Sequence, residues 1–234
     1  MFGPDILPPG ADLNDLRLDA GHAYFTDSGS GAIVILNLKT GKATRRLAGH
    51  PSTKAQPERY PVSEGGRPLL TADGSELQVN SDPIELSPDG RWLYYQPLTG
   101  PLWKVDTKAL RDPTVSEAAL AAHVHFVYDT PPLTGTAIDS AGNLYLAEMD
   151  KPRITMLTPD GDLRVLVEDA RLWNPDAMII SNQQELYIPV PQSIRLASNR
   201  GPGGKNGVLT PFKIFKLVLP AGAGRRATVP PVYG

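Results

Sequence analysis

The sequence predicts an all-β protein built as a β-propeller. A strand–turn–strand pattern occurs four times, and its most regular copy is SDPIELSPDGRWLYY at residues 81–95. There a Ser-Pro-Asp-Gly turn separates two runs of β-forming residues. The 22 glycines and 24 prolines are scattered between apolar runs, as turn residues of a β protein are. The first strands of the copies begin 68, 52 and 42 residues apart, and the last interval matches a bare four-stranded blade.

The alignment of the copies depends on one tyrosine in each second strand. These residues are Tyr24, Tyr94, Tyr145 and Tyr187. A β-sandwich of short strands is the alternative fold. A sandwich gives no reason for a turn followed by an aromatic strand to repeat, so the propeller is the better interpretation.

The composition fits a globular protein with a sizeable core and excludes several kinds of chemistry. Hydrophobic residues make up 41% and charged residues 21% of the 234 residues. The net charge of −2 lacks the basic excess of proteins that bind nucleic acid or membrane surfaces, so neither is expected as a partner. The absence of cysteine excludes disulfides, thiolate zinc sites and cysteine nucleophiles. We expect no signal peptide, no membrane span and no organic cofactor.

Each part of the chain has a local signal. Residues 1–11 are rich in proline and glycine and are predicted to be irregular, and residues 220–234 are predicted to form a loose tail. Between them, runs with period-2 alternation and Gly, Pro or Asp turns predict the blades. The four blades are expected near residues 12–47, 81–106, 134–167 and 174–218.

Two segments interrupt the blades. Residues 48–80 are a long polar insertion, in which residues 61–69 can form a hairpin with Gly65-Gly66 at its tip. Thr114 and Glu117 have the spacing of a capping box, which predicts an inserted surface helix near residues 114–124.

Four polar residues open the first strands of the four blades. They are Asn14, Asp82, Thr134 and Asp176. In a propeller the first strand of each blade lines the central channel, so these side chains should gather near one mouth of it. Carboxylate, amide and hydroxyl oxygens suit a hard cation such as Ca²⁺ or Mg²⁺. The alternative is that they satisfy backbone amides at the strand openings, as Asp and Asn often do.

Long strings of this sequence resemble the yellow/major royal jelly protein family in its bacterial branch. They are LNDLRLD and AYFTDSGSGAI in the first copy, AGHPST in the insertion, LSPDGRWLYYQPLTG in the second copy and LWNPDA in the fourth. The resemblance covers residues 12 to about 218 and implies a six-bladed propeller, of which about four blades are present here. Two N-terminal blades have no counterpart, and Thr134 stands where an Asp followed by Gly is common in the family.

The resemblance also implies a relation to the gluconolactonase/regucalcin lactonases. In those enzymes an Asn and an Asp at blade starts, with a Glu from an early blade, hold a divalent cation. That relation implies Asn14, Asp82 and Asp176 as ligands of Ca²⁺ or another divalent cation, and Asp82 or Asp176 as the catalytic base. Asp15, Thr134 and Asn174 are the expected channel residues that meet substrate.

Two functions are therefore expected. The first is binding of a small molecule at the channel mouth without established chemistry. The alternative is a metal-dependent lactonase or esterase of gluconolactonase type. Secretion or a periplasmic location is expected from the family resemblance alone.

Overall fold

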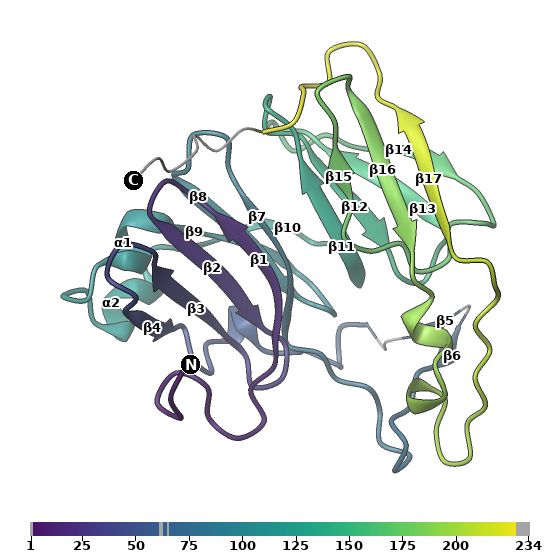
Figure 1. Ribbon diagram of the computed structural model, residues 1–234, viewed down its shortest axis with the longest axis horizontal. Helices are drawn as coiled ribbons and strands as arrows, with labels where there is room; N and C mark the ends of the chain where they lie inside the picture. Colours follow the sequence, from purple (N-terminus) through teal and green to yellow (C-terminus); the bar gives the residue numbers. More distant parts are fainter. Residues whose placement is uncertain (1, 61–62, 65, 228–234) are drawn as a thin grey trace. The chain divides into compact units, whose positions relative to one another are not determined.

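A computed structural model describes residues 2–60, 63–64 and 66–227 of the chain. The chain forms two compact units, the first built from residues 1–56, 79–130 and 227–234, and the second from residues 57–78 and 131–226. Each unit holds two antiparallel sheets with the consecutive strand order of propeller blades, and the second unit also holds a two-stranded sheet in the insertion (Figure 1). The predicted all-β fold class is confirmed, with four blades in the described part of the chain. No helix among the described residues is long and apolar enough to cross a membrane.

The first unit contains blades 1 and 2. Blade 1 has the strand order β1-β2-β3-β4, with β1 Leu13–Leu18, β2 His22–Asp27, β3 Ala32–Asn37 and β4 Ala43–Arg46. A short 3₁₀ helix, η1 Pro51–Thr53, follows it. Blade 2 consists of β7 Ser81–Leu86, β8 Trp92–Pro97, β9 Leu102–Asp106 and β10 Val124–Tyr128. Apolar side chains from facing sides of the two blades form one core, including Tyr24, Ile33, Ile84, Leu93 and Tyr95.

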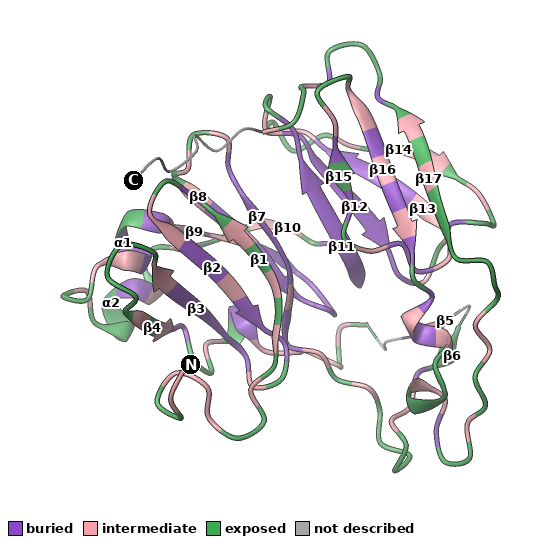
Figure 2. Ribbon diagram, in the orientation of Figure 1, coloured by how far each residue is buried: buried purple, intermediate pink, exposed green. Residues whose placement is uncertain are grey.

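The second unit contains blades 3 and 4. Blade 3 consists of β11 Leu133–Ile138, β12 Leu144–Glu148, β13 Arg153–Leu157 and β14 Leu163–Glu168. Blade 4 has three strands among the described residues: β15 Ile179–Ile180, β16 Glu185–Val190 and β17 Lys213–Val218. Two 3₁₀ helices, η2 Ser193–Arg195 and η3 Ala197–Asn199, lie between β16 and β17. Figure 2 shows β11 and β12 buried throughout, whereas β17 is largely exposed.

The strand registers confirm the alignment predicted from the tyrosines. The last residue of each first strand pairs with the residue just before the aligned tyrosine. These pairs are Leu18 with Ala23, Leu86 with Leu93, Ile138 with Leu144, and Ile180 with Leu186. Counting four residues back from the end of each first strand reaches Asn14, Asp82, Thr134 and Asp176. The four predicted channel positions are therefore equivalent within their own blades.

The prediction was wrong about the segment after blade 2. The helix near residues 114–124 is shorter, α2 Glu117–Ala121, and its N-cap is Ser116, whose hydroxyl accepts the N–H of Ala119 at 3.2 Å. Thr114 does not cap it, because its hydroxyl donates to Asp112 at 2.6 Å. The β-formers that follow pair with β9 as the strand β10, so blade 2 extends to Tyr128 instead of ending at 106.

A second short helix was also missed. It is α1 Thr107–Arg111, which begins directly after β9. The Asp106 carboxylate caps it by accepting the N–H of Ala109 at 3.0 Å.

The tail was also mispredicted as loose. The N–H of Gly224 donates to the buried Asp139 carboxylate at 2.8 Å, and the N–H of Ser140 donates to the carbonyl of Arg225 at 2.8 Å. Residues 220–226 are therefore bound to the first turn of blade 3, while the predicted loose residues 228–234 lie outside the described residues. Residues 2–11 contain no helix or strand, as predicted.

The insertion contains the predicted hairpin. Its strands are β5 Ser63–Glu64 and β6 Arg67–Pro68, and Glu64 pairs with Arg67. Gly66 has a φ of 80°, which a residue with a side chain rarely adopts. Gly65 and residues 61–62 of the predicted hairpin lie outside the described residues.

Candidate functional site

Blades 1, 2 and 3 each contain a β-bulge in the first strand, at the residue that the sequence analysis singled out. In blade 1, Asn14 and Asp15 together lie opposite the single residue Thr26. In blade 2, Asp82 and the residue after it lie opposite Gln96. A bulge inserts an extra residue, bends the strand and turns side chains in a new direction, and bulges are common beside active sites.

In the second unit, blade 3 repeats this feature. Thr134 is the extra residue in β11, since its two neighbours face adjacent residues of β12. In blade 4 the N–H of Asp176 donates to the carbonyl of Pro189 at 3.0 Å, while Ile179 pairs with Tyr187. Asp176 precedes β15, so in blade 4 the corresponding position lies in the loop that leads into the first strand. The sequence alignment found these positions, but nothing in the pattern revealed the bulges.

Asn14 and Asp82 lie side by side in the first unit. The Asn14 amide nitrogen donates to the Asp82 carboxylate at 2.6 Å. The Thr26 hydroxyl donates to the Asp82 backbone carbonyl at 2.8 Å, which joins β2 of blade 1 to β7 of blade 2. This pair is the part of the predicted polar cluster that the first unit brings together.

An ion pair lies three residues farther along the same two strands. The Arg17 guanidinium binds the Glu85 carboxylate through two nitrogens, at 2.9 and 2.6 Å, and contacts Asp15 at 2.8 Å. Glu85 is buried, with 4% of its surface exposed. Burial lowers the pKa of Arg17, but the neighbouring Glu85 and Asp15 outweigh this effect and raise the pKa above its usual range. Asp15, a predicted substrate contact, is engaged here with Arg17.

In the second unit Thr134 and Asp176 come from neighbouring blades. The buried Thr134 hydroxyl donates to the carbonyl of Pro175, next to Asp176, at 2.5 Å. Gly135 allows this approach, because a Cβ there would stand 3.0 Å from the Asp176 Cα. A side chain at position 135 would push the two blade openings apart. The expectation that Thr134 and Asp176 also lie close to Asn14 and Asp82 stays a prediction.

Asn174 lies inside the loop that precedes blade 4. It is 1% exposed, and its φ of 55° is in the left-handed region. Its carboxamide oxygen accepts the Ser193 hydroxyl at 2.7 Å and the N–H of Ile194 at 3.2 Å. Asn174 therefore holds the loop around η2, and its predicted contact with substrate stays a prediction.

The polar residues do not form a complete cation site within one unit. Asn14 and Asp82 supply amide and carboxylate oxygens, whereas Ca²⁺ takes six to eight oxygen ligands. Among residues 2–60, 63–64 and 66–227, no group of three His, Cys, Asp or Glu side chains is placed to hold a metal ion. The pair fits only part of a metal site, so we derive no catalytic step through a cation.

One Ser–His contact resembles part of a hydrolase site but is structural. His50 Nδ1 lies 2.7 Å from the Ser52 hydroxyl, which lies 2.7 Å from the Tyr95 hydroxyl. Ser52 and Tyr95 are fully buried, so no substrate can reach this serine. Burial also lowers the pKa of His50. The network fixes the short helix η1 against blade 2.

A pocket opens in the second unit at the end of blade 4 where Asp176 lies. Its volume is about 270 Å³, slightly below the usual range for small-molecule sites. Lys213, which begins β17, pairs with Val190 at the end of β16, and both line the pocket. The lining residues are Ala170, Arg171, Trp173, Val190, Gln192, Arg195, Leu209, Thr210, Pro211 and Lys213.

Buried amides and an ion pair fix the pocket walls. The Gln192 carboxamide donates to the carbonyl of Leu209 at 2.8 Å and accepts its N–H at 3.0 Å, which joins the two loops of the pocket. Glu64 of the hairpin binds the Arg195 guanidinium at 3.1 Å. The insertion thus supports the pocket from outside.

The sequence analysis missed the pocket. Its residues come from three separate stretches, 170–173, 190–195 and 209–213. Two signals pointed near it: the string LWNPDA, which contains Trp173, and the glycine-rich loop at residues 201–207, just before the third stretch. Neither pattern states which side chains meet, because that depends on the loops folding together.

The family model described as "Major royal jelly protein" matches residues 9–193. The chain belongs to this family. The match includes all four blade openings and the Trp173 side of the pocket. No curated protein sequence matches this major royal jelly protein family member.

Several solved structures share its fold. The chain is similar to regucalcin, a calcium-binding protein from Agrobacterium tumefaciens str. C58, with a TM-score of 0.54, 16% identity, and coverage of 97% of this chain and 66% of that one. It is similar to a nidogen/laminin complex chain, with a TM-score of 0.53, 16% identity, and coverage of 77% and 57%. It is also similar to the Kuenenia stuttgartiensis hydrazine synthase, with a TM-score of 0.51, 12% identity, and coverage of 78% of this chain and 42% of that one. The chain thus spans less than two thirds of each of these proteins, and the likeness concerns the fold.

Proposed function

We propose that this family member binds a small molecule in the blade 4 pocket, at the end of the blade where the channel mouth is predicted. The observation that carries the proposal is the pocket itself, with one aromatic wall and several polar groups that converge on it. Its supports are buried: Asn174 is 1% exposed and Gln192 is 7% exposed. A preformed site reduces the ordering cost of binding.

The test is a ligand-observed NMR screen of small aromatic fragments against the wild-type protein and Trp173→Ala. Loss of the indole removes stacking area, so the aromatic fragments that bind in the pocket should bind roughly tenfold more weakly to the variant. Trp92→Ala is the matched control, because Trp92 lies in blade 2 outside the pocket lining. If Trp173→Ala keeps its fold and every fragment binds it as tightly as wild type, the proposal is wrong.

The contact between Asn14 and Asp82 favours a second candidate, a metal-dependent lactone or ester hydrolase of gluconolactonase type. Its partner would be a divalent cation such as Ca²⁺, and regucalcin, to which the fold is similar, is described as calcium-binding. This candidate predicts that millimolar Ca²⁺ raises the melting temperature by a few degrees, since a ligand bound to the native state stabilises it. Asp82→Asn should remove the shift, whereas Asp160→Asn, in an exposed turn, should keep it. Absence of both a Ca²⁺-dependent shift and chelator-sensitive hydrolysis of aryl esters or lactones would eliminate this candidate.

A further inference from the structure

We infer that the blade 4 pocket selects a small aromatic anion, such as a carboxylate carried on a flat ring. This inference rests on the proposed function of the same pocket and adds the chemical class of its ligand. It follows from the charges on the lining, from how those charges are held, and from the apolar surface beside them.

The pocket lining carries positive charge, whereas the chain as a whole has a slightly negative net charge. Arg171, Arg195 and Lys213 line the pocket, and the lining contains no Asp or Glu. The whole chain has a net charge of −2, so three cations around one small cavity are a local concentration of positive charge. A cleft lined by one sign of charge attracts ligands of the opposite sign.

The neighbouring carboxylates orient the arginines without filling the pocket. Asp169 binds Nε and Nη2 of Arg171 at 2.9 and 2.6 Å, and Glu64 binds Nε of Arg195 at 3.1 Å. Nη1 of Arg195 donates to the Gln192 carboxamide oxygen at 3.1 Å. In the described part of the chain this leaves Nη1 of Arg171 and Nη2 of Arg195 as donors for a ligand.

Lys213 supplies the uncompensated charge. No ion pair of Lys213 is found within the described residues, whereas Lys216 of the same strand binds Glu185 at 2.8 Å. The two lysines are three positions apart, so they point to opposite faces of β17. Only Lys213 lines the pocket.

The remaining surface suits a flat apolar body. Trp173, Val190, Leu209 and Pro211 line the pocket beside the cations. The Arg171 guanidinium already lies 5.3 Å from the centre of the Phe215 ring, so this corner of blade 4 accepts stacked planar groups. An aromatic amine would meet the uncompensated charge of Lys213 and two guanidinium groups that offer only donors, and a bare inorganic anion would leave the apolar wall uncovered.

The test uses three probes with one ring system: naphthalene-2-carboxylate, its carboxamide and naphthalen-2-ylmethylamine. Isothermal titration calorimetry at low salt should show the carboxylate binding at least tenfold more tightly than the other two. Lys213→Ala should weaken carboxylate binding roughly five- to tenfold, and Arg195→Gln by a similar factor, because each removes a charged donor. Lys216→Ala should leave the affinity unchanged, and added salt should weaken carboxylate binding.

The outcomes separate this inference from the proposed function. Equal or tighter binding of the amide or the amine would show a working pocket and overturn the anionic ligand. The same holds if the carboxylate binds but Lys213→Ala and Lys216→Ala behave alike. If no probe binds and the fragment screen also finds no ligand that depends on Trp173, the proposed function itself is overturned.

Discussion

Asp139→Ala should lower the free energy of unfolding by about 4 kcal/mol. Asp139 is fully buried and directly follows β11. Its carboxylate accepts the N–H groups of Ala141 and Asn143, the Asn143 amide, the Tyr145 hydroxyl and the N–H of Gly224, all at 2.8 to 3.0 Å. Removing it leaves several buried donors without an acceptor and removes one of the contacts that hold residues 220–226 against blade 3. Urea unfolding followed by circular dichroism measures the loss.

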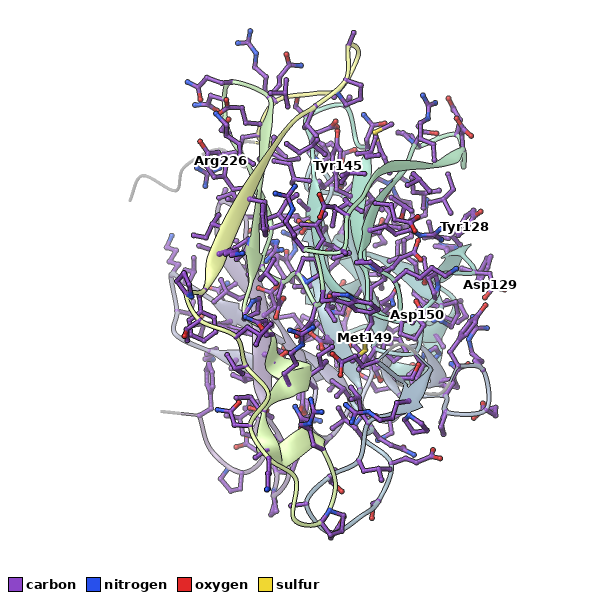
Figure 3. All side chains as sticks on the ribbon, turned by 90° about the vertical axis from the view of Figure 1, so that its right-hand side faces the viewer. Tyr128, Asp129, Tyr145, Met149, Asp150 and Arg226 are labelled. Carbon is purple, nitrogen blue, oxygen red and sulfur yellow. The ribbon has the colours of Figure 1, made fainter. Side chains whose placement is uncertain are left out.

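Two further variants make this prediction specific. Tyr145, labelled in Figure 3, is fully buried, and Tyr145→Phe should cost only about 1 kcal/mol because it removes a single hydrogen bond. The effects of Asp139→Ala and Tyr145→Phe should combine to less than their sum, since both remove the same contact. Asp160→Ala, in the exposed turn between β13 and β14, should change stability by less than about 0.5 kcal/mol. An Asp139→Ala variant as stable as Asp160→Ala would contradict the assignment.

Glu85→Ala should lower the free energy of unfolding by about 3 kcal/mol. Glu85 is buried, and the side chain of its partner Arg17 is 24% exposed, so the variant leaves a largely buried guanidinium with Asp15 as its remaining ion-pair partner. The measurement is again urea unfolding, and the loss should persist in high salt because the pair is shielded from solvent.

A double replacement distinguishes the ion pair from general damage to the strand. Arg17→Met combined with Glu85→Leu should recover most of the loss, because apolar residues of similar size remove the uncompensated charge. Arg164→Ala is the matched control, since the Arg164–Asp162 pair is 56% and 61% exposed and contributes at most about 1 kcal/mol. If the double variant is no more stable than Glu85→Ala, the cost comes from packing rather than from charge.

Local patterns predicted much of the fold for a physical reason. The alternation of side chains in a strand and the chemistry of tight turns act over a few residues, so they can be recognised in the sequence. Tyr24 and Tyr145 lie at equivalent registers, as predicted, and the structure shows that both are fully buried. Segments where two local signals compete were predicted less well. Thr114 and Ser116 are both good helix caps, and only the hydrogen bond to Asp112 removes Thr114 from that role.

In the candidate site, too, one contact was predicted from the sequence and another was not. Asn14 and Asp82 were expected to lie together, and they do, because equivalent positions of adjacent blades follow from the repeat. Arg17 and Glu85 occupy equivalent positions too, yet their pairing was not predicted, since period and turn signals carry no information on which side chains meet across blades.

The sequence by itself determined the fold class, the four blades, the register of their tyrosines and the positions of the four polar blade openings. Only the tertiary structure decided where a pocket lies and what holds each unit together internally. The Arg195–Glu64 contact joins residues 131 positions apart, and the Gly224–Asp139 contact joins residues 85 positions apart. Such contacts form when loops close over long stretches of chain, and their geometry depends on the packed blades rather than on any local pattern.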